Sequence, residues 1–149
     1  MSHFVLDNSV VMRWLQPSIK EADQCYAEAV LRQLLETEAM VPDLWHLEAA
    51  NVLLGTERQG QITTAEREHF LAQLESLPIR VDDQTAKQAF HRTMVLAEAY
   101  KLSSYDAAYL ELALRESLPL ATLDKALRAA ARKAKVALFL ETARFARQP

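Results

Sequence analysis

The 149-residue sequence contains little glycine and almost no cysteine. Its two glycines, Gly55 and Gly60, are too few for a P-loop or a dinucleotide-binding fingerprint, because both motifs need a glycine-rich phosphate loop. The single cysteine, Cys25, excludes an internal disulfide and any multi-cysteine zinc or iron–sulfur site. The histidines show no short metal-ligand spacing. A metal site in this chain would therefore use oxygen ligands, which favours Mg²⁺ or Mn²⁺.

The chain also lacks a strong charge of either sign and a long apolar run. It has 17 Lys and Arg residues against 20 Asp and Glu residues, and this mild acidity argues against coating nucleic acid through bulk charge. No apolar stretch reaches the roughly 18–20 residues that cross a membrane. The N-terminal segment has no basic region before its apolar residues, so we expect neither a signal peptide nor a membrane span. Together with the lone cysteine, these features predict a cytoplasmic protein.

Half of the residues are hydrophobic, and they follow two alternating patterns. Short apolar runs rich in β-branched or aromatic residues predict strands, and longer segments with apolar residues three and four apart predict helices. This alternation is typical of βαβ units, so we expect one α/β domain over residues 1–149, with a mainly parallel sheet and helices on both faces. The predicted strands are 3–6, 40–41, 79–81, 118–122 and 136–138. The predicted helices are a short one ending at residue 15, then 21–36, 44–54, 65–74, 85–100, 106–114 and 125–133.

Four acidic residues follow predicted strands or lie near the start of the next helix. Asp7 follows the first strand, and Glu48 lies about one turn into a helix. Asp106 lies in the first turn of a later helix, and Asp124 begins the helix after 118–122. Ligands of parallel α/β sheets bind at the carboxyl ends of the strands, so all four acids can meet at one edge. Each also has a structural explanation, because the three aspartates fit helix caps and Glu48 fits the exposed side of an amphipathic helix.

The case for a shared site is electrostatic. Two carboxylates about 4 Å apart repel by roughly 4 kcal/mol at an effective dielectric constant of about 20. A cluster of acids therefore either binds protons or recruits a divalent cation. Mg²⁺ and Mn²⁺ suit such oxygen ligands and keep sites for water and a substrate phosphate, where they polarise a phosphoryl oxygen. The pattern predicts hydrolysis of phosphodiester bonds.

Four segments carry a more specific signal: FVLDNSV, VPDLWHLEAANVLL, LSSYDAAYLELA and LATLDKAL. In this order and spacing, the sequence resembles PIN-domain ribonucleases over residues 4–138, and among them the small VapC-type toxins of toxin–antitoxin pairs. The resemblance implies a sheet of four or five strands, cleavage of RNA with Mg²⁺ or Mn²⁺, and assembly as a homodimer. It also implies a cognate antitoxin as partner.

The resemblance assigns roles to individual residues. The metal-binding and catalytic acids are Asp7, Glu48, Asp106 and Asp124, and the supporting residues are Ser9, Asn51 and Thr122. Asn8 departs from the pattern, because many relatives carry a smaller residue there. Three cations near the acids in sequence, Arg13, Lys125 and Arg128, are candidates for contacts with RNA phosphates.

Most other chemically distinctive side chains are expected to pack in the core. These are Trp14, Trp45, Tyr105, Tyr109, Phe139, Met12, Met40, Met94 and Cys25. His46 receives no catalytic role.

Two alternatives remain open. The chain could be a housekeeping ribonuclease without an antitoxin, or a binding or scaffold module that kept the fold and lost activity. The presence of all four acids argues against the scaffold.

Overall fold

A four-stranded, fully parallel sheet forms the centre of the computed structural model, which describes residues 2–141. The ends of the expected domain, residue 1 and residues 142–149, lie outside the described residues. The strand order β3-β2-β1-β4 confirms the expected α/β class. The strands are β1 (Ser2–Leu6), β2 (Glu38–Val41), β3 (Ile79–Val81) and β4 (Leu120–Ala121).

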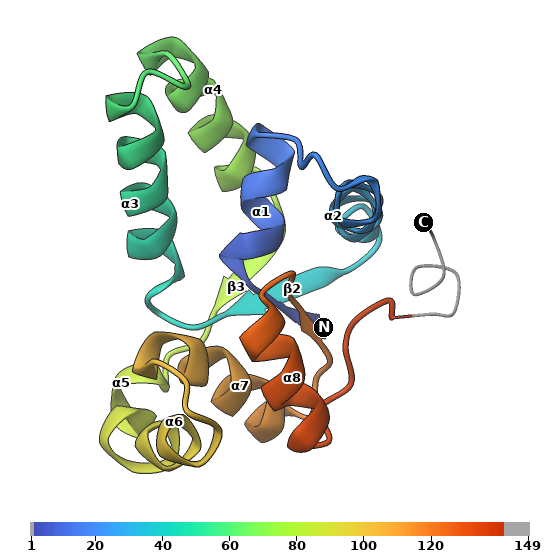
Figure 1. Ribbon diagram of the computed structural model, residues 1–149, viewed down its shortest axis with the longest axis vertical. Helices are drawn as coiled ribbons and strands as arrows, with labels where there is room; N and C mark the ends of the chain where they lie inside the picture. The colour runs from blue at the N-terminus through green and yellow to red at the C-terminus, as the bar shows by residue number, and fades with distance from the viewer. Residues whose placement is uncertain (1, 142–149) are drawn as a thin grey trace.

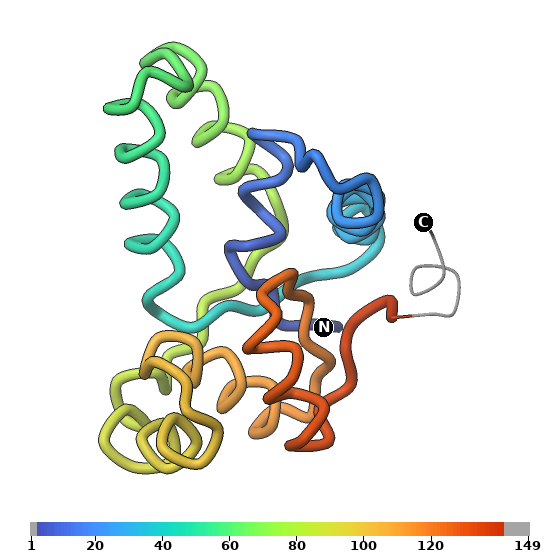
Figure 2. Tube along the Cα trace, viewed as in Figure 1, coloured from blue at the N-terminus to red at the C-terminus, as the bar shows by residue number. Residues whose placement is uncertain are grey.

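Helices cover both faces of the sheet, and the chain fills one face before the other (Figure 1). The first four helices lie on one side and the later helices lie on the opposite side, as the Cα trace also shows (Figure 2). No helix within residues 2–141 is long and apolar enough to span a bilayer. The first layer contains α1 (Asn8–Leu15), α2 (Glu21–Gln33), α3 (Trp45–Arg58) and α4 (Thr64–Glu75). The second contains α5 (Thr85–Gln88), the π-helical segment η1 (Ala89–Thr93), α6 (Met94–Tyr100), α7 (Ser104–Glu116) and α8 (Lys125–Lys133).

Strand β1 occupies the position that organises the sheet. Its residues Phe4, Val5 and Leu6 are fully buried, as expected for a central strand covered on both faces. Val5 pairs with Leu120 of β4, and β2 pairs along the opposite side of β1. After β1 the chain adds β2 and β3 on one side of it, and it later returns to add β4 on the other side. The carboxyl ends of β1 and β4 flank this reversal of strand order, which is where open α/β sheets bind ligands.

The last two predicted strands are shorter than the apolar runs suggest. β4 comprises only two residues of the predicted 118–122, because Leu118 donates its backbone N–H to Ala113 and so completes the end of α7. The run 136–138 makes a single parallel bridge, between Leu138 and Leu120. Proline 119 has no N–H to donate to a ladder, although its carbonyl accepts from Val5 at 2.9 Å.

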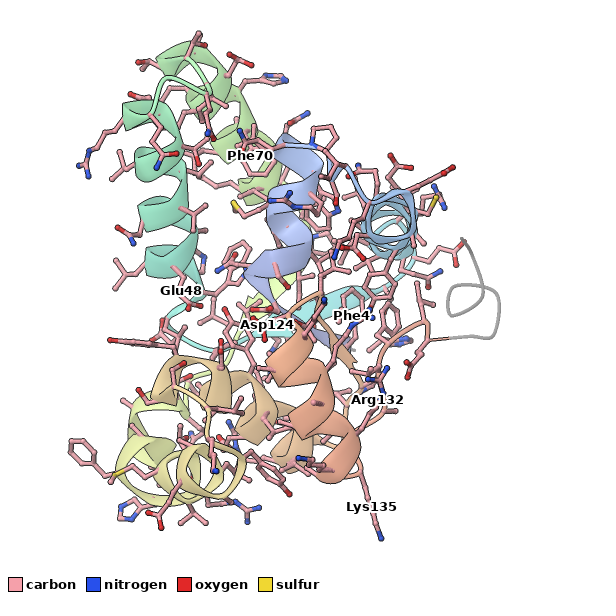
Figure 3. All side chains as sticks on the ribbon, viewed as in Figure 1. Phe4, Glu48, Phe70, Asp124, Arg132 and Lys135 are labelled. Carbon is pink, nitrogen blue, oxygen red and sulfur yellow. The ribbon has the colours of Figure 1, made fainter. Side chains whose placement is uncertain are left out.

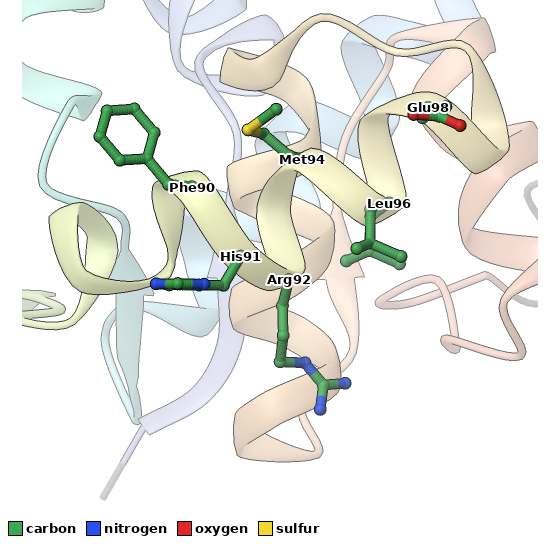
Figure 4. A pocket seen from close by; sticks show the side chains of 7 residues that line it. Phe90, His91, Arg92, Met94, Leu96 and Glu98 are labelled. Atoms are coloured by element: carbon green, nitrogen blue, oxygen red, sulfur yellow. The ribbon is translucent and has the colours of Figure 1, made fainter.

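The predicted helix over 85–100 is interrupted by η1, and much of its apolar surface faces outward. Phe90 and Met94 project from the same side of this segment (Figure 4), where they line a surface hollow of about 700 Å³. The prediction that Met94 packs in the core is therefore wrong, since 55% of it is exposed. Tyr105, at the start of α7, is likewise 62% exposed. Helical spacing identifies an apolar face but does not show whether another element covers that face. Within the described residues, Met94 and Tyr105 are left largely uncovered.

A buried ionic network ties β3 to α7. Asp82, directly after β3, and Glu111 on α7 are each 2% exposed. Both carboxylates accept hydrogen bonds from Arg115, whose guanidinium reaches Asp82 Oδ2 at 2.7 Å and Glu111 Oε2 at 2.9 Å. The guanidinium thus offsets charge that would otherwise be costly to bury.

Replacing Arg115 with alanine should destabilise the protein by about 3–5 kcal/mol, because two buried carboxylates would lose their partner. Urea unfolding measures this change. Arg67→Ala is the matched control: Arg67 pairs with Glu57 and Glu68 at the surface, where such pairs contribute about 0–1 kcal/mol. Equal losses for the two variants would contradict the prediction.

Candidate active site

Asp7 is the most deeply held of the four predicted acids. It directly follows β1, and its backbone N–H donates to the Ala121 carbonyl at 3.0 Å. Its Oδ2 accepts hydrogen bonds from the hydroxyls of Ser9 at 2.6 Å and Thr122 at 2.7 Å. The Asp7 side chain does not cap α1, so helix capping does not explain the acid at this position. The hydroxyls of Ser9 and Thr122 therefore join the ends of β1 and β4 around one carboxylate.

Asp106 lies in the first turn of α7. Ser103 caps this helix by accepting a hydrogen bond from the Asp106 backbone N–H at 3.0 Å. The capping box expected between these residues is thus half formed: Ser103 supplies the cap, and the Asp106 carboxylate makes no reciprocal hydrogen bond within the described residues. Helix capping therefore explains Ser103, whereas it does not explain why residue 106 is an acid.

Glu48 comes from the opposite helix layer. It lies near the start of α3, and Figure 3 shows it and Asp124 at the level of the sheet, between the two layers. Its Oε1 accepts a hydrogen bond from the hydroxyl of Tyr109 at 2.6 Å. Tyr109 is fully buried on α7, one turn after Asp106. This bond joins residues 61 positions apart, and the sequence pattern did not reveal it.

Asp124 caps a helix and still has a carboxylate oxygen free of that cap, so helix capping and a place in the acidic site are compatible. Its Oδ1 caps α8 by accepting from the Leu127 N–H at 2.8 Å, and its own N–H donates to the Thr122 hydroxyl at 3.1 Å. Capping uses one carboxylate oxygen, so it does not compete with a role in the acidic site. Arg128, one turn later, donates to the Thr122 carbonyl at 2.7 Å and lies 5.0 Å from the centre of the Tyr26 ring.

The four acids form one electrostatic group. Burial raises the pKa of Asp7, and the charge of Asp124 raises it further, against the lowering effect of the Ser9 and Thr122 hydrogen bonds. Burial, followed by the charges of Asp7 and Asp124, raises the pKa of Asp106 to about 6. Burial also raises the pKa of Glu48, with contributions from the charges of Asp7 and Asp106. Each acid is thus coupled to at least two of the others.

The donor set fits a hard divalent cation in its chemistry. All four groups are carboxylates, and none of them takes part in an ion pair among residues 2–141. The same residues contain no group of three or more His, Cys, Asp or Glu side chains arranged as a ready-made metal cage. Mg²⁺ commonly keeps several waters and uses one or two carboxylates together with substrate phosphate, so a complete protein cage is not required.

The remaining predicted site residues differ in their positions. Arg13 lines a hollow of about 340 Å³ together with Asn8, Ser9 and Leu123. Lys125 and Asn51 are exposed, and within residues 2–141 Asn51 makes no side-chain hydrogen bond to the acids. Asn8 is buried, and its Nδ2 donates to the Trp45 carbonyl at 3.2 Å, which ties the start of α1 to the start of α3.

The raised pKa of Asp106 predicts how stability depends on pH. Above about pH 6 this carboxyl is charged beside Asp7 and Asp124, whereas below about pH 4 it is neutral in both the folded and the unfolded chain. Its penalty therefore appears as pH rises from about 4 to 6. In metal-free buffer, Asp106→Asn should raise the Tm at pH 8, by roughly 2–4 °C for each kcal/mol of repulsion relieved, and leave the Tm at pH 4 nearly unchanged.

Thermal unfolding between pH 4 and pH 8 measures this effect, and Asp83→Asn, at an exposed position, is the control. A Tm difference between wild type and Asp106→Asn that stayed constant across this range would contradict the electrostatic cause.

Both the sequence and the fold resemble those of known proteins. The family model of the PIN domain matches residues 4–133. Among solved structures, PAE2754 from Pyrobaculum aerophilum has a TM-score of 0.67 at 23% identity, covering 99% of this chain and 97% of that one. FitAcB from Neisseria gonorrhoeae has a TM-score of 0.59 at 20% identity, covering 91% and 96%. No sequence among curated proteins matches. The structural likenesses concern the fold, and the family match over most of the sequence shows that the chain belongs to the PIN-domain family.

Proposed function

We propose that this protein is a divalent-metal-dependent endoribonuclease that acts as the toxin of a toxin–antitoxin pair. The observation that carries the proposal is the group of four coupled carboxylates at the carboxyl ends of β1 and β4, with no ion-pair partner in residues 2–141. Membership of the PIN-domain family supports a nuclease. RNA as substrate and the toxin role come from the resemblance of the four sequence segments.

Each acid has a distinct part in this proposal. Asp7, Asp106 and Asp124 would hold Mg²⁺ or Mn²⁺, with Glu48 binding directly or through water. When bound, the metal polarises a phosphoryl oxygen and lowers the pKa of water. The Ser9 and Thr122 hydroxyls fix the Asp7 carboxylate, and Asp124 is fixed by its cap.

The hollow beside Asp7 is where we place the RNA backbone. Arg13 lines this hollow and has no ion-pair partner among the described residues. Ser9 and Leu123 line it too, and the Leu123 N–H donates to the Ser9 hydroxyl at 2.9 Å. Arg13 would hold an RNA phosphate in this hollow while a neighbouring phosphodiester of the same RNA strand lies at the acids. Lys125 and Arg128 remain further candidates, although the Arg128 guanidinium already supports the Thr122 backbone.

The partners follow from the same charge pattern. An antitoxin segment that places an Arg or Lys among the four carboxylates would replace the charge of the metal through charge-assisted hydrogen bonds. We also expect a homodimer. The exposed apolar side chains around Phe90 and Met94 are a surface on which to test that expectation, because large exposed apolar patches often mark protein contacts.

Asp7→Asn should abolish RNA cleavage while the fold is retained. The amide is nearly isosteric but removes one charge from the metal-binding group. We expect a loss of more than about 100-fold, because even outer partners of a metal ligand are worth about 10–100-fold. The assay follows cleavage of mixed-sequence single-stranded RNA with Mg²⁺, Mn²⁺ or EDTA, and DNA of the same sequence tests the sugar preference.

Asp83→Asn, which removes an exposed Asp, is the control and should cleave like the wild type. The growth of cells expressing each variant at equal protein levels tests the toxin role: the wild type should slow growth, and Asp7→Asn should not. Cleavage without growth arrest would favour a housekeeping ribonuclease. Absence of cleavage with either metal would favour the scaffold module.

Arg13→Gln should weaken RNA binding without affecting the acids. Measured by fluorescence anisotropy in the inactive Asp7→Asn background, the dependence of log affinity on log salt concentration should become less steep by about 0.7, the value for one phosphate contact on a single strand. Arg58→Gln, at an exposed arginine of α3, controls for general charge. An identical salt slope in Asp7→Asn with and without Arg13→Gln would remove Arg13 from the RNA interface.

A further inference from the structure

Tyr109 occupies an unusual position for a core aromatic residue. Its ring belongs to the hydrophobic core and is 0% exposed. Its hydroxyl, however, leaves the core and donates to Glu48 Oε1 at 2.6 Å. Tyr109 belongs to α7 and Glu48 to α3, which lie in opposite helix layers in Figure 1. The bond therefore joins the two layers at the acidic edge of the sheet.

The hydroxyl of Tyr109 is held in its protonated, donating form. Burial raises the pKa of this phenol far above its ordinary value, and the charge of Asp7 and the bond to Glu48 raise it further. It therefore donates a hydrogen bond to the Glu48 carboxylate while keeping its proton and carrying no charge itself. An Arg or Lys in the same position would orient Glu48 equally well but would also offset the negative charge that attracts a cation.

The same solution appears at Asp7. The hydroxyls of Ser9 and Thr122 hold that carboxylate, and they too are neutral donors. Glu48 has the longer side chain and enters the site from the other helix layer. It therefore has more rotatable bonds to restrict than Asp7. The Tyr109 hydroxyl restricts them through its bond at 2.6 Å, and Asn8 contributes a further side-chain hydrogen bond.

We propose that Tyr109 is a positioning residue of the acidic site, which holds the Glu48 carboxylate in place for the divalent cation through a neutral hydrogen bond. The proposal rests on the proposed metal-dependent function. It goes beyond that function by assigning a role to a residue that is neither an acid nor a metal ligand.

The test removes one oxygen atom. Tyr109→Phe keeps the buried ring and deletes the hydroxyl. The control is Tyr100→Phe, which also removes a tyrosine hydroxyl, from a partly buried residue of α6 that packs against the core. Mn²⁺ affinity is measured by calorimetry without RNA, and kcat and KM are measured separately with single-stranded RNA.

We expect Tyr109→Phe to lower Mn²⁺ affinity and kcat by about 10-fold, as for other partners that orient a ligand, and to change KM for RNA by less than about 2-fold. Tyr100→Phe should leave both Mn²⁺ affinity and kcat near the wild-type values. In a Glu48→Gln background, adding Tyr109→Phe should cause no further loss of Mn²⁺ affinity, because the hydroxyl acts through the Glu48 carboxylate.

A readout without metal separates this inference from the proposed function. In EDTA at pH 8, urea unfolding of the two single variants and the double variant should show coupling between Tyr109 and Glu48. No coupling, or unchanged Mn²⁺ affinity in Tyr109→Phe while the wild type binds and cleaves, would overturn the positioning role alone. A wild type that binds no Mn²⁺ would overturn both proposals, and one that binds Mn²⁺ but cleaves no RNA would overturn only the nuclease function.

Discussion

Repulsion among carboxylates that no ion pair within residues 2–141 offsets is the constraint around which the edge of this sheet is built. The protein is able to compensate buried acids, as Arg115 does for Asp82 and Glu111. At the carboxyl ends of β1 and β4 it does not, and hydroxyl groups take the place of cations. Hydroxyls orient a carboxylate and leave its charge intact. The acidic edge therefore keeps its negative charge, and burial and the neighbouring like charges raise the pKa of Asp106 to about 6.

The strand order gives this edge its location. β1 lies between β2 and β4, so the residue after β1 faces the loop after β4 across a single ladder. Thr122 connects the two strand ends to α8, because its hydroxyl donates to Asp7 and its carbonyl accepts from Arg128. Arg128 also packs over Tyr26 of the other helix layer. Backbone and side-chain contacts thus fix the acids before any ligand arrives.

Patterns in the sequence predict the parts of this structure that depend on residues close together along the chain. Helix α8 has the predicted bounds because its cap at Asp124 and its apolar spacing are both local. The four acids could be selected because each follows a strand or lies near the start of a helix. The bond between Tyr109 and Glu48 joins distant segments, and a tyrosine at helical spacing looks the same whether its hydroxyl is used or not. The exposed positions of Tyr105 and Met94 depend on which elements lie nearby, and the π-helical turn has no signal in the apolar spacing.

The pairing of β1 with β4 also has a consequence during synthesis. Asp7 is made before Thr122 and Asp124, which follow more than a hundred positions later along the chain. At about 5–20 residues per second, a ribosome needs roughly 6–23 s to travel from the first acid to the last. Throughout that interval the nascent chain carries β1 and its carboxylate without the β4 partner that completes the edge. The acidic edge therefore cannot assemble before Asp124 has been made, and a chain released before that residue lacks it.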